Sequence, residues 1–194
     1  ELTATEEKAE ELARNIHATR EKAAPTFNDA IQTTLARLGM PEARFVVQLT
    51  PAPALTPTGD DEIDFLFTAN GNFAPQKVER IASGGEISRV MLAHRMELPT
   101  IIFDEIDTGV SGRIADAMGE IIADLSQTMQ VVDITHLPQV ASKGDTHFVV
   151  YKDAEGSHIR RLDPEERITE IAKMLSGSQI TEAALAQARI LLDK

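Results

Sequence analysis

The sequence of 194 residues has no cysteine, which excludes a small secreted fold stapled by disulfides. It also has no apolar run that approaches the roughly 20 residues of a membrane span, and no secretory pattern at its start. We therefore expect a protein of the reducing cytoplasm without a membrane partner. The first residue is Glu1 inside a helical pattern, so we also expect a part cut from a longer chain.

Positive charge is scarce. The chain has 19 Lys and Arg against 31 Asp and Glu, a formal net charge of -12. Such a surface does not bind nucleic acid through general attraction to phosphate. A DNA partner would have to be held by a local patch, by a missing segment or by topological embrace. The length and the 42% of hydrophobic residues predict one domain with one sizeable core.

The motif Ser83-Gly84-Gly85-Glu86 predicts the start of a helix. Ser83 and Glu86 have the spacing of a capping box, in which each side chain bonds a backbone N–H at the helix start. The two glycines between them leave the first N–H groups open to a close approach, and the helix dipole favours an anion there. The alternative is a well-capped turn with no ligand.

A second polar pair follows a short apolar segment. Ile101, Ile102 and Phe103 predict a buried strand, and Asp104 and Glu105 come directly after it. Because successive strand residues point to opposite sides, we expect one carboxylate to face a magnesium ion and the other an attacking water. The alternative is an acidic loop that only solvates the strand end.

The order of these motifs resembles the second half of ABC-type ATPases. SGGE resembles their signature motif, IIFDE their Walker B strand, the segment at Asp107 their D-loop, and Ile134-Thr135-His136 their H-loop. Four segments are similar in sequence to the C-terminal part of the RecN family: ASGGEISR, FDEIDTGVSG, THLPQVA and residues 166–175. Members of this family are bacterial SMC-like proteins of DNA double-strand-break repair. The similarity extends from about residue 45 to the end.

The resemblance implies an α/β fold, the C-terminal lobe of an ABC/SMC-like ATPase head with a mainly parallel sheet and a coiled-coil stub. Residues 1–24 would be the end of the coiled-coil arm and residues 25–194 the C-terminal half of the head. An ordinary surface helix is the alternative for 1–24. The resemblance also implies a cytoplasmic, nucleoid-associated bacterial protein that acts on DNA.

The site residues implied by the resemblance have distinct roles. Glu105 would be the general base or orient the water, His136 would contact the γ-phosphate, and Asp104 would hold Mg²⁺ through water. The residues Ser83, Gly84, Gly85 and Glu86 would bind ATP on a different subunit. Asp107 would belong to the D-loop.

No GxxxxGK[ST] P-loop occurs in the sequence, so this chain alone should bind ATP weakly or not at all. We expect the P-loop in an N-terminal half of the same protein, packed against this sheet. Two complete heads would then form a homodimer around two ATP molecules. The alternatives are a non-catalytic dimerisation or clamp module and the nucleotide-binding subunit of a transporter.

The remaining elements follow from periodicity and turn residues. We expect Pro25 to end or kink the first helix and Thr26 to cap a second one. Strands are expected over 44–50 and 62–69, separated by a proline-rich loop at a sheet edge. After Asp107, strands and helices alternate, which predicts parallel pairing of the strands near 101–103, 131–134 and 147–151. A hairpin around Glu155-Gly156 and two helices, 164–176 and one from about 181, end the chain.

Overall fold

The structure is a computed structural model that describes residues 2–80, 84–93, 98–177 and 179–193. The chain divides into two compact units, Glu1–His94 and Arg95–Lys194. Each unit has buried apolar side chains of its own, so the single core expected from the chain length is wrong. None of the helices in the described part of the chain is long and apolar enough to cross a membrane.

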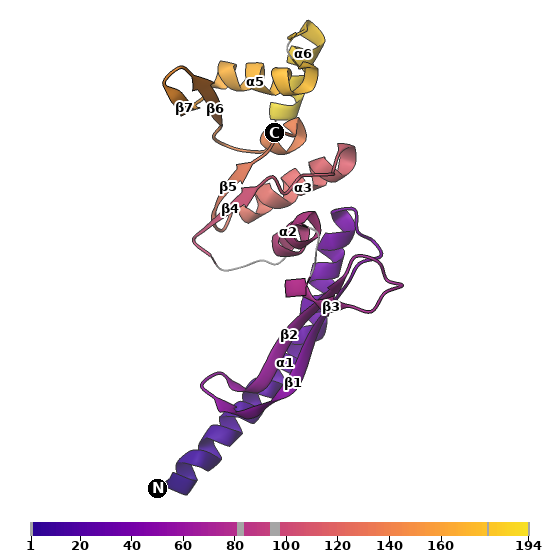
Figure 1. Ribbon diagram of the computed structural model, residues 1–194, viewed down its shortest axis with the longest axis vertical. Helices are drawn as coiled ribbons and strands as arrows, with labels where there is room; N and C mark the ends of the chain where they lie inside the picture. The colour runs from indigo at the N-terminus through magenta and orange to yellow at the C-terminus, as the bar shows by residue number, and fades with distance from the viewer. Residues whose placement is uncertain (1, 81–83, 94–97, 178, 194) are drawn as a thin grey trace. The chain divides into compact units, whose positions relative to one another are not determined.

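The first unit consists of a long helix and a β-hairpin that runs along it (Figure 1). Its elements are α1 (Leu2–Arg37), β1 (Arg44–Thr56), β2 (Gly59–Thr68), β3 (Gln76–Lys77), a 3-10 turn (Val78–Arg80) and α2 (Gly84–Ala93). The strands form an antiparallel sheet in the order β1-β2-β3. A turn follows β2, where the Phe73 N–H donates to the Asn70 carbonyl at 3.0 Å.

Helix α1 continues through Pro25, so the separate helix predicted from Thr26 is wrong. A proline inside a helix removes one hydrogen bond and costs about 3 kcal/mol. Packing of the following turns offsets this cost, because Ile31 and Leu35 are buried in the core and Phe27 packs against it. The assignment of residues 1–24 to a coiled-coil arm stays a prediction.

Strand β1 is longer than predicted, because it runs through Pro51 and Pro53 to Thr56. The proline-rich segment is therefore strand up to Thr56, not loop. Its place explains the prolines: β1 is the edge strand of the sheet, where a missing N–H breaks no ladder bond, and its register with β2 shifts between Pro51 and Thr56. The predicted position at a sheet edge is confirmed.

Polar contacts fasten the far end of the hairpin to α1. His17 Nδ1 lies 2.6 Å from Asp61 Oδ1, and the Arg20 guanidinium donates to Asp61 Oδ2 at 3.1 Å and to the Thr58 carbonyl at 2.7 Å. The Asp61 side chain is almost fully covered. These contacts tie the helix and the hairpin together several turns before the apolar core of the unit begins.

The second unit contains the parallel pair β4 (Thr100–Asp104) and β5 (Gln130–Ile134), joined by α3 (Gly112–Leu125). The strand–helix–strand prediction is confirmed. Phe103 is buried on one face of the pair, and α3 has a buried stripe that includes Met118 and Ile122. A crossover helix covers one face of its sheet, and these buried side chains mark that face. Ile102, Val132 and Ile134 on the other face are exposed.

The predicted parallel pairing of the third strand is wrong. After the short helix α4 (Pro138–Ala141), β6 (Phe148–Asp153) pairs antiparallel with β7 (Gly156–Arg161). The two-residue turn at Ala154 and Glu155 brings the chain straight back, and Asp153 accepts from two N–H groups of this turn. A local hairpin closes at a lower entropic cost than a distant pairing.

The two C-terminal helices are α5 (Pro164–Ser176) and α6 (Glu182–Leu192), at the bounds predicted from sequence. Asp163 and Glu166 form a capping box at the start of α5, Gly177 follows its end, and Thr181 caps α6. The apolar faces of the two helices pack together. Their buried residues are Ile171, Ala172, Ala184 and Ala188.

Candidate functional site

The carboxyl ends of β4 and β5 lie at the same edge of their sheet. Asp104, the last residue of β4, stands opposite Ile134, the last residue of β5. The segments that follow, Glu105–Asp107 and Thr135–His136, therefore start side by side. Ligands of open α/β sheets bind at such an edge. The structure thus brings together four of the predicted site residues: Asp104, Glu105, Asp107 and His136.

Glu105 lies outside strand β4, which ends at Asp104. The prediction that strand alternation points the Asp104 and Glu105 side chains to opposite sides is therefore wrong, because Glu105 is not part of the strand. Glu105 has a φ of 49°, the one positive φ at a non-glycine position among the described residues. Its N–H donates to the Ile134 carbonyl at 3.0 Å and its carbonyl accepts from the Thr108 hydroxyl at 2.9 Å. The exposed Glu105 thus stands where the chain turns away from the sheet, in a backbone conformation that costs free energy.

Asp107 is buried, with 1% of its surface exposed. The Thr135 hydroxyl donates to its Oδ2, and its Oδ1 lies 3.5 Å from His136 Nδ1. Thr135 Oγ1 also accepts from the Leu137 N–H at 3.0 Å. The segment after β4 and the segment after β5 are therefore joined through one carboxylate, while the His136 side chain stays largely exposed.

Sequence reasoning missed Asp133 on β5. Neither of its carboxylate oxygens has a hydrogen-bond partner. Burial raises the pKa of Asp133 to about 7, and the negative charge of Asp107 contributes to the rise. Asp133 stands opposite the buried Phe103 in the register, and a single carboxyl inside the apolar run Val131–Ile134 was the signal that could have found it.

The residues predicted to form a signature motif belong to the first unit, where α2 begins at Gly84. Gly84 is exposed, and a Cβ added to it would meet no atom within 4 Å. Gly85 and Glu86 complete the first turn of the helix. Ser83 lies outside the described residues, so the predicted capping box stays a prediction. The predicted helix start is confirmed.

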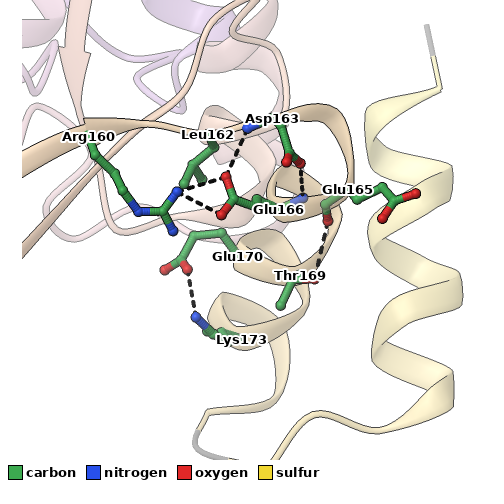
Figure 2. A pocket seen from close by; sticks show the side chains of 8 residues that line it. All are labelled: Arg160, Leu162, Asp163, Glu165, Glu166, Thr169, Glu170 and Lys173. Carbon is green, nitrogen blue, oxygen red and sulfur yellow. Dashed lines mark hydrogen bonds and ion pairs between the residues drawn. The ribbon is translucent and has the colours of Figure 1, made fainter.

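A pocket in the second unit lies against the first turns of α5 (Figure 2). Its two cationic side chains are both paired: Arg160 contacts both carboxylate oxygens of Glu166 at 2.7 Å, and Lys173 contacts Glu170 at 3.0 Å. Asp163 and Glu166 hold the helix start through the capping box. These pairs close the connection between β7 and α5, so we assign the pocket a structural role.

The described residues contain no group of three or more acidic, histidine or cysteine side chains that could hold a metal ion by themselves. Asp104 supplies one exposed carboxylate at the strand end. Mg²⁺ prefers oxygen ligands and commonly takes one or two carboxylates together with phosphates and water. Asp104 therefore fits a magnesium ion that a nucleotide brings with it.

No family model matches the chain. It is 39% identical to the DNA repair protein RecN of Rickettsia felis, over 94% of this chain and 35% of that protein. It is 36% identical to the RecN of Vibrio cholerae, over 93% of this chain and 34% of that protein. The similarity to RecN is confirmed. The chain matches the C-terminal part of RecN and spans about a third of the length of these relatives.

Solved structures give the fold. The chain matches a structure from a study of ATP-driven dimerisation and DNA-stimulated activation of SMC ATPases with a TM-score of 0.53, at 16% identity, over 84% of this chain and 99% of that one. The Smc head domain of Pyrococcus furiosus gives a TM-score of 0.57 at 18% identity, over 86% of this chain and 41% of that one. The predicted α/β fold of an SMC-like head is confirmed.

Proposed function

We propose that this chain is the C-terminal lobe of an ATP-hydrolysing, RecN-like head that acts in DNA double-strand-break repair. The observation that carries the proposal is the shared edge of β4 and β5, where Asp104, Glu105 and His136 follow the two strand ends. The similarity to RecN sequences and the fold of SMC heads support it. The same similarity favours this function over that of a transporter subunit.

In this proposal, the exposed residues at the carboxyl ends of β4 and β5 have different roles in hydrolysis. Glu105 orients the attacking water and accepts its proton, and His136 contacts the γ-phosphate. Asp104 holds Mg²⁺ through water, and the ion neutralises charge on the phosphates when it is bound. The turn that begins at Glu105 supports this division, because it carries that carboxylate away from the strand direction followed by Asp104.

The ATP site would be completed by other parts. We infer a P-loop half of the same protein, because the chain has no phosphate-cradling motif of its own. The exposed apolar side chains of Ile102, Val132 and Ile134 give that half a sheet face to cover. In a homodimer of heads, Ser83, Gly84, Gly85 and Glu86 would bind the γ-phosphate on the partner. The open surroundings of Gly84 support such a close approach.

The proposal places the protein in the bacterial cytoplasm near the nucleoid, with DNA as partner of the whole protein. The net charge of -12 disfavours broad electrostatic contact between DNA and this lobe. DNA would then be bound by other parts of the protein. ATP-dependent dimerisation of the heads would control the binding and release of DNA.

Steady-state ATP hydrolysis as a function of protein concentration tests the proposal. The chain alone should be inert, and a head that joins it to a P-loop half should show a specific activity that rises with concentration. Glu105→Gln in the joined head should keep ATP binding and dimerisation and lower turnover by about two orders of magnitude or more. Ser83→Arg should block ATP-dependent dimers without unfolding the protein. A joined head that stays inert with and without DNA would overturn the proposal and favour the clamp module.

A further inference from the structure

We propose that Asp107 is a positioning residue, which holds His136 through Thr135 in the orientation needed for hydrolysis. This inference rests on the proposed function, because it concerns the role of His136 in that reaction. It differs from a D-loop role at a subunit interface, since the carboxylate of Asp107 points into its own unit and is 1% exposed.

The Thr135 hydroxyl makes two hydrogen bonds. It donates to Asp107 Oδ2 and accepts from the Leu137 N–H at 3.0 Å. One hydroxyl group therefore links the buried carboxylate to the backbone just after His136. Because Thr135 precedes His136, the histidine is held on both sides. The His136 side chain itself is 63% exposed.

The imidazole ring of His136 approaches the same carboxylate. His136 Nδ1 faces Asp107 Oδ1 at 3.5 Å, and this oxygen is buried without a hydrogen-bond partner. A small rotation of the imidazole would close this distance to a hydrogen bond. The ring would then carry its proton on Nδ1 and present Nε2, on its opposite edge, to a phosphate or water. A carboxylate that fixes the tautomer of a histidine in this way is a common positioning device.

The buried position of the Asp107 carboxylate costs free energy. Burying a carboxylate with one oxygen unpaired is unfavourable, and Asp133 adds a second buried carboxyl group close by. An apolar residue at position 107 would pack at lower cost. Retaining a charge there is explained if the carboxylate orients His136.

The test uses the joined head and a matched pair of variants at one position. Thr135→Val keeps the side-chain volume and removes the hydroxyl, whereas Thr135→Ser keeps the hydroxyl. We expect Thr135→Val and Asp107→Asn to lower kcat about 10-fold or more with the KM for ATP changed less than about 3-fold, and Thr135→Ser to retain most activity. Thr128→Val is the control, because that hydroxyl donates to the Leu125 carbonyl at the end of α3, away from the site.

Double variants separate positioning from mere stability. If Asp107 and Thr135 act through His136, then adding Thr135→Val to His136→Ala should lower kcat no further. Additive losses would contradict the inference. If His136→Ala alone leaves kcat unchanged, the proposed role of His136 fails, and the tautomer measurement still decides whether Asp107 orients the ring.

That measurement is the nitrogen NMR spectrum of His136 in protein labelled with ¹⁵N-histidine. At a pH where the ring is neutral, the wild-type protein should carry the His136 ring proton on Nδ1, and Asp107→Asn should shift the ring toward a mixture of the two tautomers. A spectrum that does not change between wild type and Asp107→Asn would overturn the inference. Thr135→Ser should keep the wild-type tautomer.

Discussion

Asn28 on α1 accepts a hydrogen bond through its side-chain Oδ1 from the backbone N–H of Val47 on β1, at 3.0 Å. Four residues later on the same helix, Gln32 Oε1 accepts from the Phe45 N–H at 3.3 Å. The helix thus covers the free edge of β1 with amide side chains, one turn apart. These bonds fix the register between helix and hairpin in a way that apolar packing alone would not.

We expect Asn28→Ala to destabilise the protein by about 1–3 kcal/mol, because it leaves the Val47 N–H without its partner. Thermal and urea unfolding measure the change. Asn15→Ala, at an exposed position of the same helix, serves as the control and should change stability by less than about 0.5 kcal/mol. Equal effects of the two variants would show that the edge contact does not contribute.

The contact between His17 and Asp61 predicts a pH-dependent stability. The hydrogen bond to Asp61 raises the pKa of His17, with smaller contributions from Glu21 and Asp60, and the same bond lowers the pKa of Asp61, with help from Arg20. The raised pKa contributes stability below about pH 6.5 that is lost as the pH rises through the folded-state pKa. The lowered pKa contributes stability above about pH 4 that is lost as the pH falls.

His17→Gln should therefore lower the melting temperature most between about pH 4 and 6.5, and its effect should shrink toward pH 9. Melting curves of both proteins at several pH values give the difference. Asp61→Asn should reduce the stability in the same window and also above it, because Arg20 loses its partner. A difference between wild type and His17→Gln that does not vary with pH would contradict this account.

The buried carboxyl of Asp133 predicts a loss of stability as the pH rises. A carboxyl whose pKa rises to about 7 on folding favours the protonated form, so the folded protein loses stability as the pH rises from about 4 to 7. Asp133→Asn removes this loss. Its melting temperature should exceed that of wild type by an amount that grows from pH 4 to 7 and is constant above. The exposed Asp124 on α3 provides the control, since Asp124→Asn should show no such growth.

Gly119 on α3 stands where a larger side chain would clash with its neighbours. A Cβ at this position would lie 2.9 Å from Lys143 Cγ and 3.0 Å from the Gln139 carbonyl oxygen. Gly119→Ala should therefore cost about 1–3 kcal/mol, despite the better helix propensity of alanine. Unfolding in urea measures this loss. Gly84→Ala is the matched comparison and should not lower stability, because the added methyl group meets no atom within 4 Å.

The sequence predicted those features whose cause is local. The bounds of α5 follow from Asp163 and Gly177, and the strand–helix–strand order around Asp104 follows from apolar runs and their breaks. The positions of Asp104 and His136 at strand ends could be predicted for the same reason.

Features that depend on tertiary partners could not be predicted. Pro25 stays inside α1 because the following turns find a hairpin to pack on, and β6 turns back on β7 instead of joining the parallel pair. The left-handed turn at Glu105 and the contact of Asp107 with Thr135 join segments 28 residues or more apart in sequence. No local pattern around Asp107 shows that its carboxylate is buried.

The prolines of β1 have a consequence for self-association. The N–H groups of Phe45 and Val47 point away from β2 and are taken by α1, and by alternation Pro51 stands at a later position of the same row. Proline has no N–H to offer. A protruding edge strand ordinarily templates β-pairing with other molecules, but three positions of this row offer no free N–H to a neighbouring molecule. The occupied and missing donors therefore lower the tendency of this edge to pair with another chain.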